Sequence, residues 1–231
     1  MFVSMWMTKD VITVTPDTLV TEIAVTMSQR RIRRVPVLMQ DGETTKLLGL
    51  VSSQDVLHAF PPDVNPLNFF SDVSPVTRGA SSANITLTAK DVMVTNPLVT
   101  APEAPIEEVA RLMRDKKIGA LPVVRNEQLA GIITESDLFR AFANIFDPGS
   151  HGVRITFDNS KGEDVFPLIA QVTHHHRLRV TSFVSLLNHE RPVCVVQVIG
   201  ENTEAMLNDI WKSHHQVISV IQLDGPEEDK K

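Results

Sequence analysis

The sequence repeats itself once, and this repeat constrains the possible folds more than any other feature. With an offset of 86 residues, Met7 falls on Met93. A turn that is four residues shorter in the second copy changes the offset to 82, so that Gly49 falls on Gly131. Each copy has only about 55 residues, too few to bury much surface alone. We therefore expect the two copies to pack face to face around a shared core, with pseudo-twofold symmetry.

Both copies predict the same order of elements, βαββα. After a short extended segment, apolar residues at positions i, i+3, i+4 and i+7 predict a helix in each copy. These residues are Val20, Ile23, Ala24 and Met27, matched by Ile106, Val109, Ala110 and Met113. Two strands follow, "RVPVLM" and "KLLGLVS" or "ALPVVR" and "QLAGIIT", and a last helix begins near Ser52 or Thr134. The stretch "ITLTAKDVM" is expected to be extended and to lead into the second copy.

The rest of the chain divides into a linker, a third region and a tail. Residues 61–87 are rich in Pro, Ser and Asn, which is typical of a loop. Residues 151–223 predict strands and helices in the order βαββαβ, a ferredoxin-like unit whose second helix is "TEAMLNDIWKSHH". The predicted domains are therefore residues 1–60, 88–146 and 151–223, with a linker at 61–87 and a tail at 224–231. The fold class is α+β.

Composition excludes some classes of function. General nucleic-acid binding needs a basic face, and the formal net charge of -6 makes that function unexpected. No apolar run approaches the ~18–20 residues that span a bilayer, and the N-terminus lacks the pattern of a signal peptide. The only cysteine, Cys194, excludes an internal disulfide. We expect a cytoplasmic protein that binds neither nucleic acid nor membrane.

The turn between the second strand and the last helix carries the same motif in both copies, "GLVSSQD" and "GIITESD". Ser52 with Asp55, and Thr134 with Asp137, have the spacing of a capping box, which satisfies the free N–H groups of a helix start. A helix N-terminus also attracts phosphate, and a nearby carboxylate can accept hydrogen bonds from ribose hydroxyls. Capping and ligand binding are compatible, and the motif alone leaves both open.

A basic stretch, "RRIRR" at residues 30–34, precedes a predicted buried strand. Arg31 has a basic counterpart, Lys117, and favourable charge at a helix C-terminus explains such a pair. Arg33 and Arg34 have no basic counterparts, because residues 119 and 120 are Gly and Ala. Clustered guanidiniums repel one another unless an anion or acidic surface neutralises them, and phosphate matches their forked donors. The stretch therefore predicts a polyphosphate-binding cleft to which the first copy contributes more charge.

The repeat, with "RIRRVPV" and "KIGALPV" followed by "GLVSSQD" and "GIITESD", resembles tandem CBS (cystathionine-β-synthase) domains, the Bateman module. This resemblance implies that an adenosine-containing ligand binds between the paired domains. Carried over by motif, the carboxylates of Asp55 and Asp137 would hold the ribose hydroxyls. The phosphate contacts would come from Ser52, Thr134, Arg31 and Lys117, with Arg33 and Arg34 beside them. Val11, Ile12, Pro97 and Leu98 would flank the adenine.

The third region resembles an ACT domain, a regulatory module that often binds amino acids at a dimer interface. Its first loop, "DNSKGED", has the usual glycine but lacks the usual proline. A CBS pair followed by an ACT domain is the layout of regulators of acetoin utilisation, which the whole chain resembles. The resemblance implies a homodimer that acts on a protein target, requires no cofactor and takes an adenine nucleotide as regulatory ligand.

Other functions stay open beside nucleotide sensing. A structural or adaptor dimer with an empty cleft, an amino-acid sensor and a nucleotide hydrolase are alternatives, although no catalytic nucleophile and base occur together in a recognisable motif. Histidines 174–176 and 214–215 invite comparison with a metal site. Because adjacent helical residues point about 100° apart, we expect neither a metal site nor catalytic residues.

Overall fold

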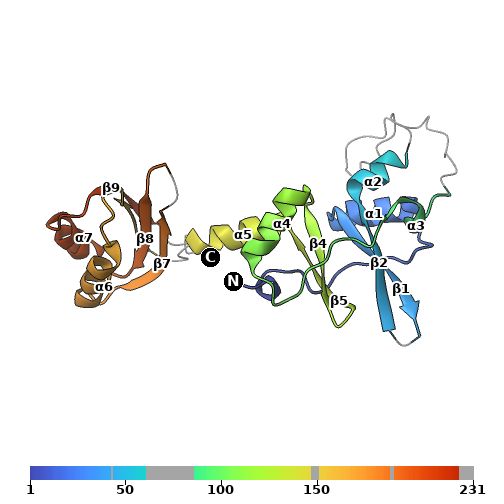
Figure 1. Ribbon diagram of the computed structural model, residues 1–231, viewed down its shortest axis with the longest axis horizontal. Helices are drawn as coiled ribbons and strands as arrows, with labels where there is room; N and C mark the ends of the chain where they lie inside the picture. The colour runs from blue at the N-terminus through green and yellow to red at the C-terminus, as the bar shows by residue number, and fades with distance from the viewer. Residues whose placement is uncertain (43, 61–85, 147–150, 188–189, 224–231) are drawn as a thin grey trace, which may run out of the picture. The chain divides into compact units, whose positions relative to one another are not determined.

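The computed structural model describes residues 1–42, 44–60, 86–146, 151–187 and 190–223 (Figure 1). The chain divides into two compact units, unit 1 from Met1 to Phe139 and unit 2 from Arg140 to Lys231. Most of the predicted linker and the predicted tail lie outside the described residues. The boundary between the units falls within helix α5 (Glu135–Phe146). The sequence instead placed a domain boundary after this helix, between residues 146 and 151. The domain limits proposed from the sequence stay predictions.

Unit 1 contains both copies of the repeat. The first copy has η1 (Val3–Met5), α1 (Val20–Arg30), β1 (Arg34–Asp41), β2 (Thr44–Ser52) and α2 (Ser53–His58). The second has α3 (Ala89–Val92), β3 (Val94–Thr95), α4 (Ile106–Lys116), β4 (Ala120–Arg125), β5 (Gln128–Thr134) and the start of α5. The expectation that "ITLTAKDVM" is extended throughout is wrong. The N–H and hydroxyl of Thr88 donate to the Asp91 carboxylate at 2.8 and 2.7 Å, and this cap starts the short helix α3.

Each copy receives its edge pairing from the other copy. β3, from the second copy, pairs antiparallel with β2 of the first, with Leu50 opposite Val94. The equivalent segment of the first copy forms an antiparallel bridge from Thr8 to Ile132 of β5. Thr8 and Val94 are counterparts under the repeat, as are Ile132 and Leu50. This reciprocal exchange supports the expected pseudo-twofold relation.

The glycine of each turn motif makes room for this exchange. A Cβ atom on Gly49 would lie 2.9 Å from the carbonyl oxygen of Val94, and one on Gly131 would lie 2.7 Å from that of Thr8. Both contacts are too close for any other residue unless the backbone shifts. The close approach expected at these glycines is therefore made by the other copy's chain.

The hydrophobic core of the first copy is closed by the second. Helix α1 buries the four predicted residues, Val20, Ile23, Ala24 and Met27, against Val35, Val37, Val51 and Val56 of the same copy. Ala89 of the second copy belongs to the same cluster. Full burial of a valine or isoleucine side chain stabilises the fold by about 1.5–3 kcal/mol. The core of the first copy is complete only with a residue of the second.

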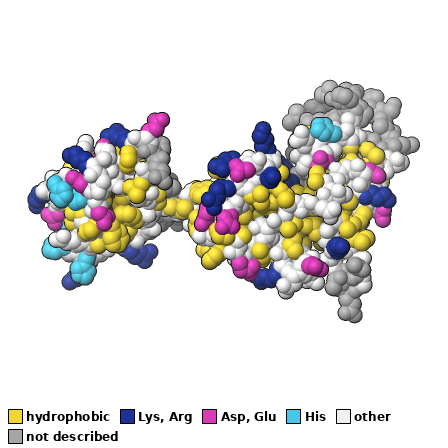
Figure 2. Space-filling model, in the orientation of Figure 1, with side chains coloured by type: hydrophobic (Ala, Val, Ile, Leu, Met, Phe, Trp, Pro, Cys, Tyr) yellow, Lys and Arg dark blue, Asp and Glu magenta, His cyan; other side chains and the backbone are white. Residues whose placement is uncertain are grey.

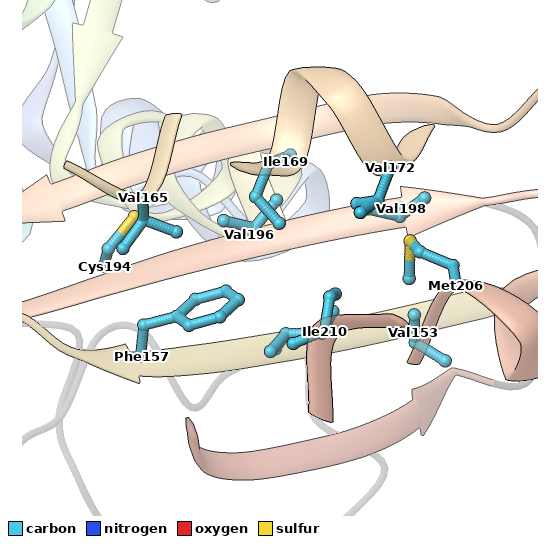
Figure 3. Close-up of a cluster of buried hydrophobic side chains, with 11 residues drawn as sticks. Val153, Phe157, Val165, Ile169, Val172, Cys194, Val196, Val198, Met206 and Ile210 are labelled. Atoms are coloured by element: carbon cyan, nitrogen blue, oxygen red, sulfur yellow. The ribbon is translucent and has the colours of Figure 1, made fainter. Parts of the chain in front are cut away.

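Unit 2 has the order βαββαβ expected from the sequence. Its elements are β6 (Gly152–Asp158), α6 (Val165–His175), β7 (Arg179–Leu186), β8 (Val193–Ile199), α7 (Thr203–Trp211) and β9 (Val217–Leu223). The sheet is antiparallel in the order β7-β8-β6-β9, and α6 and α7 cover one face of it (Figure 1). Phe157 and Val196 of the sheet pack against Ile169 of α6 and Ile210 of α7 (Figure 3).

In unit 2, the start of α6 agrees with the prediction from the sequence, whereas the end of α7 differs from it. Pro167 is the third residue of α6, in the first turn, where its missing N–H costs nothing. Helix α7 ends at Trp211, four residues before the predicted end, so that His214 and His215 lie in a bend. Among the described residues, no helix combines the length and apolar character that a membrane crossing needs.

Candidate functional site

A cavity of about 450 Å³ lies between the two copies in unit 1. Its walls come from residues 8, 10–12 and 31–34 of the first copy and from residues 119, 132 and 134–137 of the second. The first copy supplies the basic side chains, and the second supplies the start of α5 with its capping turn. Small-molecule sites in proteins commonly have volumes of about 300–1,000 Å³, so the cavity is large enough for a nucleotide-sized ligand.

Three arginines stand along one wall of the cavity. Arg31 ends helix α1 in the left-handed conformation, with φ of 53°, and is exposed together with Arg33. Arg34 is half-buried, and this burial lowers the pKa of its guanidinium. The Glu135 carboxylate opposes the shift in the pKa of Arg34, and the charge of Arg33 adds to it. The wall is thus a partly desolvated cluster of positive charge, which an anion would stabilise.

Gly119 explains why this cluster forms on one side of the pseudo-twofold axis. A Cβ atom at residue 119 would overlap the Arg34 guanidinium and lie 2.8 Å from Glu135 Oε2. The counterpart of Gly119 in the first copy is Arg33, and that of Arg34 is Ala120. In the second copy, the missing side chain of Gly119 leaves room for the Arg34 guanidinium. In the first copy, the side chain of Arg33 stands at the equivalent position. The asymmetry expected from the sequence has a steric basis.

The capping turn of α5 adds a carboxylate to the part of the cavity wall that comes from the second copy. The N–H and hydroxyl of Thr134 donate to Asp137 Oδ2 at 2.9 and 2.8 Å, and the N–H of Asp137 donates to Thr134 Oγ1 at 3.4 Å. Asp137 is 6% exposed. Because these hydrogen bonds fix the side chain, the carboxylate is oriented before any ligand arrives.

Seven of the residues proposed from the sequence line this cavity, and five do not. Those in its walls are Val11, Ile12, Arg31, Arg33, Arg34, Thr134 and Asp137. The five outside its walls are Ser52, Asp55, Pro97, Leu98 and Lys117. These five are counterparts under the repeat of residues that line the cavity. Ser52 and Asp55 form the matching capping box at α2, with hydrogen bonds of 2.6–3.3 Å. A binding role for the five stays a prediction.

Several lining residues were not proposed from the sequence. Glu135 and Ser136 lie in the first turn of α5, inside the motif "GIITESD", whose signal pointed only to its two capping residues. Ile132 and Thr8 reach the cavity because the copies exchange edge segments. No local pattern marks that exchange.

The comparison with known families agrees with this architecture. The CBS domain model matches residues 3–62 and 89–144, which are the two copies described above. The chain belongs to the CBS domain family. The matched ranges lie in unit 1 except for their last five residues, 140–144, and they stop before β6, so the family assignment says nothing about the βαββαβ unit.

Similar proteins include enzymes and proteins without a known activity. An inosine-5'-monophosphate dehydrogenase from Korarchaeum cryptofilum is 27% identical over 200 residues, which are 81% of this chain and 36% of that protein. An uncharacterised Bacillus subtilis protein, YlbB, is 31% identical over 51% of this chain and 66% of its own length. The chain spans between about a third and two thirds of these relatives. CBS domains therefore occur within larger enzymes, and membership alone does not decide whether a protein is catalytic.

Among solved structures, a putative acetoin utilization protein (AcuB) from Vibrio cholerae is 31% identical. The match covers 63% of this chain and 93% of that one, with a TM-score of 0.49. A second structure, CBSX2 in complex with AMP, is 27% identical over 63% of this chain and 98% of its own, with a TM-score of 0.48.

Proposed function

We propose that this chain is a non-catalytic regulatory protein that senses an adenine nucleotide in the cavity between its CBS copies. The ligand is AMP, ADP, ATP or an NAD-like dinucleotide. The observation that carries the proposal is the pairing of three arginines from one copy with the Thr134–Asp137 capping turn of the other across one cavity. Phosphate and ribose need these two kinds of group, cations and a fixed carboxylate.

Different residues of the cavity walls match the phosphate, the ribose and the adenine of a nucleotide. The guanidiniums of Arg31, Arg33 and Arg34 would bind the phosphates, and each forked donor set can form two parallel hydrogen bonds. Asp137 would accept hydrogen bonds from the ribose, and Thr134 lies beside it at the helix start. Val11 and Ile12 supply apolar surface for the adenine. The pseudo-equivalent residues Ser52, Asp55, Pro97, Leu98 and Lys117 form a candidate second site that carries less charge.

Regulation follows if the ligand has different affinities for two arrangements of the copies, because a ligand shifts an equilibrium only by that difference. We assign unit 2 to the ACT type and propose that it mediates a homodimer or contacts a protein target in the cytoplasm. We further propose that the regulated process is acetoin utilisation or related carbon metabolism. The support for this last step is the order of the chain, a CBS pair followed by a βαββαβ unit.

Calorimetry tests the nucleotide site with a matched pair of variants. The full chain is titrated with AMP, ADP, ATP and NAD, and at least one is expected to bind. Asp137→Asn should weaken that binding by about tenfold or more, because a hydrogen bond to a charged group contributes about 1.5–3 kcal/mol. Asp55→Asn changes the same position of the other capping box, outside the cavity walls, and should leave the affinity of the site at Asp137 within about twofold, since it can affect only the candidate second site.

Two results would contradict the proposal. One is the absence of heat with all four nucleotides together with an unchanged melting temperature, since a ligand of the folded state must raise it. The other is an equal loss of affinity in Asp55→Asn and Asp137→Asn, which would move the ligand away from the described cavity. The first result would favour a structural or adaptor protein.

A further inference from the structure

A cluster of possible metal ligands lies in unit 2, remote in sequence from the nucleotide cavity. Glu163 belongs to the loop between β6 and α6, and His214 and His215 belong to the bend between α7 and β9. Both connections meet at a depression of about 480 Å³, which all three side chains line. Figure 2 shows several histidine side chains exposed on the visible face of this unit.

The geometry brings three donor atoms together. One ligand atom from each of Glu163, His214 and His215 lies within 4.8 Å of the other two. Ligands bonded at about 2.1 Å to a tetrahedral ion lie about 3.4 Å apart, so small side-chain rotations would complete the site. The rings of His214 and His215 have centroids 4.2 Å apart and are tilted by 32°. Two adjacent histidines can face one ion here because α7 has already ended at Trp211.

A buried nitrogen atom gives independent support. Nδ1 of His215 is buried and has no hydrogen-bond partner among the described residues. Buried polar atoms almost always have a partner, and an exception needs an explanation. The backbone N–H of His215 donates to Ser213 Oγ at 3.3 Å, which helps to hold the bend. A metal ion is a natural partner for an imidazole nitrogen that faces no hydrogen-bonding group.

We propose that Glu163, His214 and His215 bind a divalent first-row transition metal ion of the zinc type, with a fourth position left for water. Imidazole and carboxylate ligands suit Zn²⁺, Co²⁺ and Ni²⁺. One carboxylate with two neutral imidazoles neutralises half of the charge of such an ion. Ca²⁺ and Mg²⁺ require mainly oxygen ligands and fit this set poorly.

A second cluster in the same unit is less suited to a metal. His175, His176 and Asp209 also bring ligand atoms within 4.8 Å of one another. Asp209 already accepts a hydrogen bond at 2.8 Å from His176 Nε2 and one at 3.1 Å from Lys212 Nζ. The Asp209 carboxylate is thus already occupied by Lys212, the residue that follows α7, and the Lys212 ammonium would repel an incoming cation.

Zinc binding tests the proposal on the full chain without an affinity tag, after removal of bound metal with a chelator. Titration against a zinc indicator should give one tight site per chain. Glu163→Gln, His214→Ala and His215→Ala should each weaken Zn²⁺ binding by about tenfold or more, since even changes outside the ligand shell cost 10–100-fold. His175→Ala, in the second cluster, and His174→Ala, outside both clusters, are the matched controls and should bind Zn²⁺ as the unmodified chain does.

The absorption spectrum of bound Co²⁺ supplies a second readout that does not depend on folding stability. Intense bands of four-coordinate Co²⁺, absent from the spectrum of Glu163→Gln, would support the site. Three results would overturn it: no Zn²⁺ binding by the chelator-treated chain, binding unchanged in all three ligand variants, or binding lost in His175→Ala. If a histidine variant fails to fold by circular dichroism, Glu163→Gln decides, because it keeps the size of the side chain and leaves the bend between α7 and β9 unchanged. Nucleotide binding is measured separately, so failure here leaves the function of unit 1 untouched.

Discussion

The two residues that end the equivalent helices of the repeat have the same unusual backbone. Arg31 and Lys117 end α1 and α4 with φ of 53° and 54°. The left-handed conformation costs a residue with a Cβ atom roughly 1–2 kcal/mol, and helices commonly place glycine there. Strain of this kind, when it recurs, often serves a function. The structure separates the two positions, because only Arg31 lines the described cavity.

Arg31→Gly and Lys117→Gly are therefore expected to behave alike in stability and differently in binding. Both relieve the left-handed strain, and each should raise the free energy of unfolding by up to about 1 kcal/mol. Arg31→Gly should also weaken nucleotide binding by about tenfold, because it removes a phosphate contact. Differential scanning calorimetry and nucleotide titration of both variants check the two effects. Equal nucleotide affinities in the two variants would show that Arg31 does not contact the ligand.

At the scale of elements, three helices of unit 1 begin with the same capping interaction, but only one of the three lies at the cavity. Helices α2, α3 and α5 begin at Ser52, Thr88 and Thr134, each of which donates to an aspartate three residues later. The pattern thus belongs to helix capping, which contributes about 1 kcal/mol per helix. Only the box at α5 faces the described cavity. The motif predicts the helix start, and its position in the fold makes one copy a candidate binding group.

The end of strand β6 carries a carboxylate whose ionisation should affect the stability of unit 2. Hydrogen bonds from Ser160 and the nearby Arg191 guanidinium lower the pKa of Asp158 to about 2. The unfolded value is about 3.9. Because the pKa is lower in the folded state, Asp158 stabilises the fold above about pH 4, and this stabilisation is lost as the pH falls toward 2.

Asp158→Asn should therefore flatten the fall in unfolding free energy between about pH 4 and pH 2. Denaturant unfolding at a series of pH values measures this slope for both chains. Part of the slope should remain, since Asp209, in the same unit, also has a lowered pKa through a hydrogen bond from His176. Identical slopes in the two chains would mean that Asp158 has no differential ionisation.

At the scale of the whole molecule, the chain separates two candidate sites into two compact units. The cavity between the CBS copies belongs to unit 1, and the cluster of Glu163, His214 and His215 belongs to unit 2. The unit boundary falls within α5, whose first turn lines the cavity. On the face that Figure 2 shows, basic and acidic side chains are interspersed over both units.

We expect calorimetric unfolding to show two transitions that respond to different ligands. A nucleotide at about 100 times its dissociation constant adds about 2.7 kcal/mol to the unit that binds it, so it should raise one transition. Zn²⁺ should raise the other. At the same ligand concentrations, Asp137→Asn should reduce the first shift alone, and His215→Ala the second alone; a tenfold loss of affinity cuts a shift of this size by about half. A single transition raised by both ligands would show that the units unfold together, which the division of the chain does not predict.

Much of the fold could be predicted because it depends on local patterns. The spacing of Val20, Ile23, Ala24 and Met27 defined the buried face of α1, and alternation defined the strands of unit 2. Side-chain periodicity follows from helix and strand geometry, so it can be read without knowing what packs against it. The repeat itself predicted the pseudo-twofold pair, and "RRIRR" predicted a cleft lined by arginines, whose anion binding stays a prediction.

Only the tertiary structure decided which groups meet. The amino-acid order shows that Arg34 has no basic counterpart, but not that its guanidinium lies over Gly119 of the other copy. Nor does it show that Thr8 of the first copy pairs with a strand of the second, and Val94 of the second with a strand of the first. It also does not show that Glu163 approaches His215. These contacts join segments that are far apart in the chain. They depend on the register of the strands, on the residue at which a helix ends and on the packing between the copies. Local periodicity predicts none of these three properties.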